Sequence, residues 1–198
     1  VFAFFGSFAA FGIGNMVQSN SVAGALSSTF NVSPRITGIV LAILTALVIF
    51  GGIKRIASFT EKLVPFMAIF YIVGALIILV LNISQIPAAF VLIFKQAFTP
   101  TAAVGGFAGS IVMQSMRYGI ARGVFTNEAG LGSAPIAHAA AKTDHPVRQG
   151  LWGIFEVFAD TIVVCSMTAL TIIVTGAWQL TDASGKGLSG AALSATAF

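Results

Sequence analysis

The stretch AVGGFAGSIVMQSMRYGIARGVFTNEAGLGSAPIAHAAAK, residues 103–142, sets a glycine-interrupted apolar segment directly before a dense polar loop. The chain around this stretch is strongly apolar. Irregular backbone at membrane depth survives only where it is buried in protein or lines a cavity, because unpaired amides and carbonyls are costly in hydrocarbon. The glycine-rich segment is therefore a candidate ligand site.

The composition of the chain indicates a membrane protein. Hydrophobic residues make up 57% of the 198 positions and charged residues only 8%, with a mean hydropathy of +0.98. A soluble domain needs a more polar surface than this. The net charge of +4 fits the basic bias of cytoplasmic loops, and no basic stripe with interleaved aromatics suggests nucleic-acid binding. A single cysteine, Cys165, gives neither a disulfide framework nor a cysteine-based metal site.

The apolar segments predict an all-α polytopic membrane protein, since a span needs about 20 apolar residues. We expect the first span to be one continuous helix, and Pro65 to lie near the first turn of the third span, where its missing amide costs little. Phe90, Ile93 and Phe94 recur at helical spacing, which indicates an interfacial helix over residues 86–98. The chain opens and closes within apolar segments, so we expect a fragment of a longer protein. The predicted spans are about 1–30, 36–53, 63–81, 101–120 and 150–178.

The basic residues between these spans predict the orientation. Seven lie in alternate loops on one side, and three lie on the other. The side with more lysine and arginine faces the cytoplasm. The loop 121–149 is then cytoplasmic and the interfacial helix external. The seven are Lys54, Arg55, Lys62, Arg117, Arg122, Lys142 and Arg148, and the three are Arg35, Lys95 and Lys186.

Three glycines within five residues of the fourth span favour an unwound segment over simple close packing of helices. Glycine permits unusual dihedral angles, and freed amides and carbonyls can hold a carboxylate and a cation. An aromatic ring there can cap an apolar side chain. The residues predicted to contact substrate are Gly105, Gly106, Phe107, Gly109, Ser110 and Gln114.

In the first span, Gly6, Ala10, Gly14 and Gln18 recur every fourth residue and would share one helix face. The small side chains of such a stripe let another helix approach closely. Gln18 is its polar end, and two interpretations of this residue are equally favoured. It either contacts the substrate or makes a hydrogen bond between helices.

Glu156 and Asp160 are four residues apart and lie on one face of the fifth span. Acidic residues inside spans are costly and are functional candidates by default. At least as well supported is a structural anchor, paired with Arg117, Arg122 or the loop 121–149. Two adjacent carboxylates can also share a proton.

The segment TNEAGLGSAP, residues 126–135, predicts an ordered loop packed under the helical bundle. Ser133 is expected to cap a short helix that begins near Ala134. Asn127 and Glu128 join Glu156 and Asp160 as candidate structural or coupling residues. The two histidines, His138 and His145, match no metal-ligand pattern and are interpreted as solvated loop residues.

Two other kinds of site find little support in the residues. The sequence lacks a complete dinucleotide fingerprint and a GK[ST] phosphate loop. An intramembrane hydrolase using Ser110 and His138 is an alternative, but His138 lies in the cytoplasmic loop and a dyad needs hydrogen-bond reach. A non-transporting membrane scaffold is a further alternative.

The block GGFAGSIVMQSMRYGIARGVFTNEAGLGSAPIAHAAAKTDHPVRQG, residues 105–150, resembles the alanine or glycine:cation symporter family, also called sodium:alanine symporters. The segment FGIGNMVQSNSVA, residues 11–23, is similar to the polar helix that precedes this block in the family. The resemblance covers all 198 residues and is most distinctive over residues 119–160.

The resemblance implies a bacterial or archaeal inner-membrane carrier with the leucine-transporter-like inverted-repeat bundle, in which two helices are broken at the midplane. The five spans would be core helices three to seven. Gln18 would match a polar position beside the amino acid, and Gly105 to Ser110 the break in helix six. The other broken helix would lie upstream of this chain.

From this resemblance we expect a secondary transporter rather than an enzyme, with no cofactor. It would bring in alanine or glycine together with sodium by alternating access. Both amino acids are candidate substrates, and sodium and protons are both candidate coupling ions. The residues that bind the ion are left unassigned.

Overall fold

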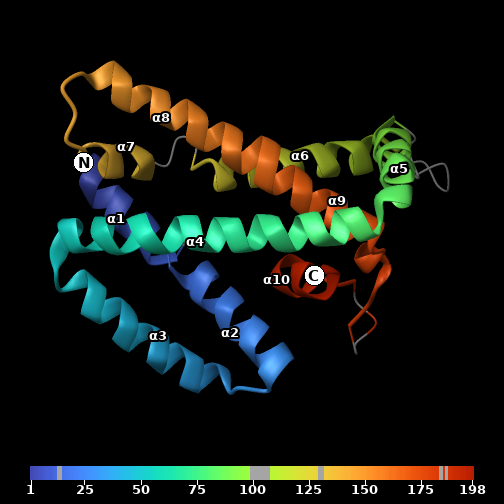
Figure 1. The fold of residues 1–198 in the computed structure, drawn as a ribbon, viewed down its shortest axis with the longest axis horizontal. Helices are drawn as coiled ribbons and strands as arrows, with labels where there is room; N and C mark the ends of the chain where they lie inside the picture. Colours follow the sequence, from blue (N-terminus) through green and yellow to red (C-terminus); the bar gives the residue numbers. More distant parts are fainter. Residues whose placement is uncertain (13–14, 99–107, 129–131, 183–184, 186) are drawn as a thin grey trace. The chain divides into compact units, whose positions relative to one another are not determined.

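The computed structural model describes every residue except 13–14, 99–107, 129–131, 183–184 and 186 (Figure 1). The described residues form helices and, apart from one isolated bridge between Thr181 and Gly187, no β-structure. The α-helices are α1 (Phe2–Gly12), α2 (Met16–Phe30), α3 (Pro34–Ile49), α4 (Gly52–Leu81), α5 (Ile86–Phe98), α6 (Ala108–Thr126), α7 (Ser133–His138), α8 (Pro146–Phe158), α9 (Ser166–Val174) and α10 (Gly190–Ala197). Short 3-10 turns, η1 (Ile83–Gln85) and η3 (Ala177–Gln179), and a π-helix, η2 (Ala159–Cys165), complete the list.

Two helical stretches among the described residues are long and apolar enough to cross a bilayer, Gly52–Leu81 and Pro146–Val174. Their 30 and 29 residues extend about 45 Å at 1.5 Å per residue, more than the hydrocarbon thickness of about 30 Å. Large apolar side chains are exposed along both, such as Phe70 at 76% and Ile154 at 69%. Contiguous apolar exposure of this extent is rare in soluble proteins. The all-helical class expected from the sequence is confirmed, and the two long apolar helices are consistent with a membrane protein.

The chain divides into two compact units, and each is described by itself. The first unit comprises Val1–Ile78 and Thr175–Phe198, and the second comprises Leu79–Val174.

The expectation of one continuous helix over the first 30 residues is wrong. The structure has α1 and α2 instead, with Asn15 at the N-cap of α2. The sequence at this point is Gly12-Ile-Gly-Asn15, and glycine and asparagine both have low helix propensity. The predicted stripe from Gly6 to Gln18 is therefore divided between two helices and is not one helix face.

The turns that bound α3 follow from local chemistry. The residue Asn31 has φ of 58°, its amide donates to the Ser27 carbonyl and the Val32 amide donates to the Leu26 carbonyl, which closes α2. Pro34 then starts α3, at a position where a missing amide costs little. After α3, Gly52 has φ of 71°, a conformation that favours glycine, and the chain reverses into α4.

Helix α4 begins at Gly52, eleven residues before the predicted third span at 63. Its first part carries Lys54, Arg55, Glu61 and Lys62, so hydropathy alone placed the boundary too late. Pro65 therefore lies inside the helix and not in its first turn, which corrects that expectation. The carbonyl four residues earlier loses its helical donor as a result.

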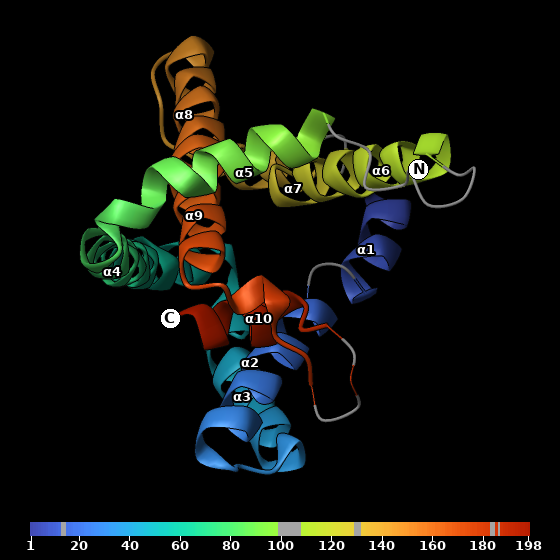
Figure 2. The ribbon, with the colours of Figure 1, turned by 90° about the vertical axis from the view of Figure 1, so that its right-hand side faces the viewer.

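Helix α10 packs within the first unit against α2 and α4 (Figure 2). The ring of Phe198 lies 4.9 Å from that of Tyr71, measured between centroids, and close to Gly74. The small residues Ala75 and Ala197 are buried at this contact region. Small side chains let helices approach closely, which is how membrane helices gain packing energy.

The second unit is organised around the crossing of α5 and α9 (Figure 2). Its apolar core contains Leu79, Ala89 and Val174, with Ile86 and Leu170 packed against them. A helix is present over the residues predicted for the interfacial segment, Ile86–Phe98. Its position at a membrane interface stays a prediction.

The fifth predicted span corresponds to α8, η2 and α9, which follow one another without interruption from Pro146 to Val174. The ring nitrogen Nδ1 of His145 accepts a hydrogen bond from the Val147 amide at 3.2 Å and caps this rod. The fourth predicted span, 101–120, corresponds to α6, which begins at Ala108 and continues to Thr126. The loop predicted over 121–149 is shortened accordingly and contains α7.

Candidate functional site

A cavity of about 640 Å³ in the second unit, which we call the polar cavity, is lined by residues from the end of α6, from α7 and from the fifth span. All four candidate structural or coupling residues predicted from the sequence line it. These are Asn127, Glu128, Glu156 and Asp160, and Ser133 and His138 join them.

Asn127 connects the end of α6 to the π-helix. Its side-chain amide donates to the Gly123 carbonyl at 3.0 Å, and its Oδ1 accepts from the Thr161 hydroxyl at 3.0 Å. Asn127 and Thr161 are both partly buried and 34 residues apart in sequence. The asparagine therefore fixes two helices of the second unit to each other through a single side chain.

Glu128 adopts an unusual backbone conformation at the point where α6 has ended. Its φ is 49°, in the left-handed region that non-glycine residues rarely occupy. The Ser133 hydroxyl donates to its carboxylate. Ser133 was expected to be the N-cap of α7, but it is the first residue of that helix, and Gly132 with φ of 79° occupies the cap. Its hydroxyl thus stabilises the loop instead of the helix end.

His138 makes two side-chain contacts and is not the solvated histidine that the sequence suggested. The Gln149 amide nitrogen lies 2.7 Å from Nδ1, and Nε2 lies 3.5 Å from a Glu156 carboxylate oxygen. These two contacts attach α7 to α8.

Asp160 occupies the first turn of the π-helix, four residues after Glu156. Its Oδ2 is buried and has no hydrogen-bond partner in the described part of the structure. A buried polar atom without a partner is uncommon and requires a physical explanation. π-Helices are rare and occur frequently at functional sites. Among the residues that line the polar cavity, Asp160 is therefore the one with a buried side-chain oxygen that accepts no hydrogen bond in the described part of the structure.

The arginine partners proposed for the two acids are not observed. Among the described residues, the ion pairs are His138 with Glu156 and Arg148 with Asp144. Glu156 thus contacts His138 of the loop, and its role as an anchor stays a prediction. Within the same part of the chain, no group of three or more His, Cys, Asp or Glu side chains is placed to hold a metal ion.

The predicted substrate residues are distributed over both units. Gln18 lies exposed on α2 in the first unit. Gly105, Gly106 and Phe107 lie outside the described residues. Gly109, Ser110 and Gln114 belong to α6, so the backbone is helical from Ala108 and the predicted unwound segment does not extend through Ser110. The side chains of Ser110 and Gln114 lie outside the described part.

The sequence identified residues that line the polar cavity but not the residues that form hydrogen bonds to them. Thr161 and Gln149 were not singled out, although both bond to residues that line the polar cavity. For Gln149 one signal was available. Proline is frequent at the first position of a helix, so the His145-Pro146 pair marks the start of the helix that contains Gln149. Nothing comparable marks Thr161, which lies within an apolar run.

Comparison with known proteins gives matches along the whole chain. The profile of the sodium:alanine symporter family matches residues 1–198. The chain is 56% identical over 197 residues to the sodium/alanine symporter AgcS of Methanococcus maripaludis, which covers 98% of this chain and 43% of that protein. It is 41% identical over 164 residues to the sodium/proton-dependent alanine carrier protein of Bacillus sp. strain PS3, covering 83% of this chain and 36% of that protein.

A third relative differs in the substrate that its name gives. The Bacillus subtilis protein named "Probable sodium/glutamine symporter GlnT" is 43% identical over 180 residues, covering 91% of this chain and 37% of that protein. The chain thus spans less than half the length of each of these three relatives.

Proposed function

This chain belongs to the sodium:alanine symporter family, and from that premise we propose that it is the central part of a secondary transporter that couples amino-acid uptake to a cation. The observation that supports this most strongly is the family match over all 198 residues. The protein is a membrane protein and not an enzyme, since its relatives are named as symporters and carriers. The alternative of a hydrolase using Ser110 and His138 is thereby wrong.

The proposed substrate is alanine or glycine, and the proposed coupling ion is sodium. Two relatives have names that include alanine and one has a name that includes glutamine, so a small neutral amino acid is the class of substrate best supported. We place the fold in the leucine-transporter-like inverted-repeat class, in the inner membrane of a bacterium or archaeon. No cofactor is needed, because transport involves no covalent chemistry.

Substrate would bind at the start of α6. The first four amides of a helix have no partner within it, and the helix dipole favours a carboxylate at that end. Helix α6 begins at Ala108, two residues after Gly106. In this proposal the substrate carboxylate meets these amides, and Phe107 and Gln18 stay sequence-based candidates for contact with the substrate.

The polar cavity would transmit the state of this site to the fifth span. Asn127 ends α6 and bonds to Thr161 of the π-helix, so a displacement of α6 reaches Asp160 through one side chain. Coupling between two ligands requires that both bias the same conformational equilibrium, and each then raises the other's affinity by the same factor. In alternating access, that equilibrium lies between outward-open and inward-open forms.

Uptake by the full-length protein in vesicles tests the proposal. With an imposed sodium gradient, labelled alanine should accumulate, and collapsing the gradient should abolish accumulation. Unlabelled glycine and glutamine as competitors rank the substrates. Accumulation that ignores both sodium and proton gradients would show that the protein is not a cation-coupled symporter.

Two variants test the placement of the substrate. Gly106→Leu should abolish uptake, because a bulky side chain fills the space and restricts the backbone. Gln18→Ala should raise the KM for alanine about tenfold, the loss of roughly one hydrogen bond of 1.4 kcal/mol. A Ser28→Ala variant on the same helix serves as control, because that hydroxyl bonds to the Ala25 carbonyl of its own helix. Wild-type kinetics in Gly106→Leu would contradict the substrate site.

A further inference from the structure

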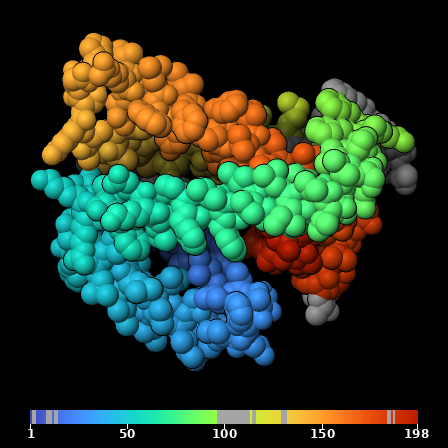
Figure 3. Space-filling model, viewed as in Figure 1, coloured from blue at the N-terminus to red at the C-terminus, as the bar shows by residue number. Residues whose placement is uncertain are grey.

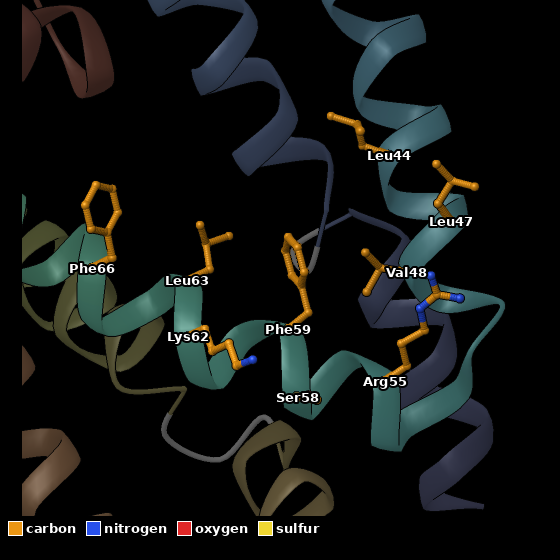
Figure 4. A pocket seen from close by; sticks show the side chains of 9 residues that line it. All are labelled: Leu44, Leu47, Val48, Arg55, Ser58, Phe59, Lys62, Leu63 and Phe66. Carbon is orange, nitrogen blue, oxygen red and sulfur yellow. The ribbon is translucent and has the colours of Figure 1, made fainter.

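Helices α3 and α4 of the first unit diverge from the Gly51-Gly52 turn and leave a recess of about 720 Å³ between them (Figures 3 and 4). We call it the basic groove. Its walls are apolar on both helices, and its polar lining comes from α4. The residues that the argument uses are Leu44 and Leu47 of α3 and Arg55, Phe59, Lys62 and Phe66 of α4.

The two cations of the basic groove share one face of α4. Arg55 and Lys62 are seven residues apart, which is two helical turns. Figure 4 shows the Arg55 guanidinium beside Val48 of α3 and the Lys62 side chain extending toward Phe59. Within the described residues neither cation forms an ion pair with a carboxylate. Both charges are therefore available to an anion.

The turn before α4 contributes to the position of Arg55. A Cβ atom added to Gly51 would lie 2.0 Å from the Arg55 Cδ, so the arginine side chain folds back over a residue that lacks a side chain. This brings the guanidinium to the end of the groove that is nearest the turn (Figure 4).

The apolar part of the groove is open in the first unit. Phe59 is 49% exposed, Leu47 is 56% exposed and Phe66 is 68% exposed. From Arg55 to Phe66 the groove follows α4 for eleven residues, or about 16 Å at 1.5 Å per residue. The four residues beyond Lys62, about 6 Å of helix, form the apolar wall of α4 past the two cations.

From this arrangement we propose that the basic groove binds an anionic phospholipid of the cytoplasmic leaflet. Its phosphate would lie between Arg55 and Lys62, and its acyl chains would follow the apolar wall toward Phe66. Basic pockets between membrane helices on the cytoplasmic side bind lipid headgroups in this way. The charge count that places the α3–α4 turn in the cytoplasm puts the cations at the matching surface. An acidic peptide would match the cations but not the apolar wall of leucine and phenylalanine side chains beside them.

Titration of the purified full-length protein with phosphatidylglycerol tests this assignment. Bound lipid is counted by native mass spectrometry, with phosphatidylcholine and inorganic phosphate as separate probes. Wild type should bind phosphatidylglycerol in preference to phosphatidylcholine. Each cation removed should weaken binding about fivefold, so Arg55→Gln combined with Lys62→Gln should weaken it roughly twenty-five-fold.

Lys54→Gln is the matched control, because it removes the same charge from the same helix but does not line the groove. It should change binding less than twofold. Leu44→Trp fills the apolar half of the groove while keeping both charges, and it should weaken lipid binding as well. Leu44 is already 54% exposed, so this variant keeps the test decisive if the double variant fails to fold.

Three results would overturn the proposal. Equal binding of phosphatidylglycerol by wild type and the folded double variant would mean that another site holds the lipid. Displacement of the lipid by inorganic phosphate at equal concentration would identify a free-anion site. Unchanged lipid binding together with loss of thermal stability in Leu44→Trp would show that a helix from the rest of the protein fills the groove.

Discussion

In the polar cavity of the second unit, polar and charged side chains bond to one another, whereas in the basic groove of the first unit two cations border an apolar recess without a carboxylate partner. The cavity joins α6, α7 and the fifth span through internal hydrogen bonds. In the basic groove, the cations Arg55 and Lys62 can bind an anion from outside the unit. The comparison teaches that polar groups which bond to one another link the helices of a unit, whereas cations without a carboxylate partner can bind an anion.

Because its side chains bond to one another, we expect substitutions in the polar cavity to reduce stability and uptake more than substitutions in the basic groove. Substitution of Asn127 should have the largest effect. In Asn127→Ala the Thr161 hydroxyl loses its acceptor, at a cost of about 2 kcal/mol in the free energy of unfolding, whereas the Gly123 carbonyl keeps the backbone amide of residue 127. Alanine uptake should fall more than tenfold, because α6 no longer moves with the π-helix. Thermal unfolding and uptake of the full-length variant measure both.

Thr161→Ser is the matched control for Asn127, since it keeps the hydroxyl that donates to Oδ1. It should retain most of the uptake, whereas Thr161→Val should resemble Asn127→Ala. Equal uptake in Thr161→Ser and Thr161→Val would break the link between the hydrogen bond and transport.

The second-largest effect is expected at Gly52, in the turn between the two helices that form the basic groove. Gly52→Ala places a side chain at φ of 71°, which costs about 1–2 kcal/mol of stability. Phosphatidylglycerol binding should weaken with it, because the turn sets the separation of α3 and α4. Gly38→Ala on α3 is the control, since nothing lies within 4 Å of its added Cβ atom, and it should be neutral or slightly stabilising. A fully stable Gly52→Ala variant would show that the turn adapts.

Within the polar cavity, Asp160 is the exception to the pattern of internal hydrogen bonds. Because its buried Oδ2 accepts no hydrogen bond, Asp160→Asn loses no bond at that atom and should change stability by no more than about 1 kcal/mol. Uptake should decrease if this carboxylate takes part in coupling. The melting temperature and the sodium dependence of uptake are the measurements. A variant that is clearly less stable would show that the carboxylate has a stabilising partner in the full-length protein.

The smallest effect is expected for the contact between His138 and Glu156. Glu156 is 64% exposed at its side chain, so the coupling energy should be below about 0.5 kcal/mol. A double-mutant cycle of His138→Gln and Glu156→Gln measures it. The exposed pair Arg148 and Asp144 provides the comparison, and its coupling should be just as small. A coupling above 1.5 kcal/mol would mean that the full-length protein buries the contact.

The helical class of the chain was predictable, and the ends and interruptions of its helices were not. Residues 86–98 form a helix as predicted, because apolar side chains recur at its period. The divided first span and the early start of α4 were missed, since hydropathy does not register where a helix ends or how far it extends beyond the hydrocarbon. Pro65 shows the same limit, because a proline is tolerated inside α4 when its neighbours continue the helix.

For the candidate site too, the polar residues were predictable from the sequence and their distant partners were not. The sequence identified Asn127, Glu128, Glu156 and Asp160 as polar or acidic residues that an apolar chain does not keep without a reason. Their partners lie far along the chain, and no periodic signal joins residues 34 positions apart.

By itself, the sequence determined the membrane environment, the helical class and the family, because each depends on composition, periodicity and motif, which are properties of consecutive residues. The tertiary structure alone decided that Asn127 meets Thr161, that His138 meets Glu156, and that Arg55 and Lys62 share a groove with α3. The physical reason is that a hydrogen bond or a recess depends on distances of a few ångströms between atoms of different helices. Those distances are fixed only when the helices pack.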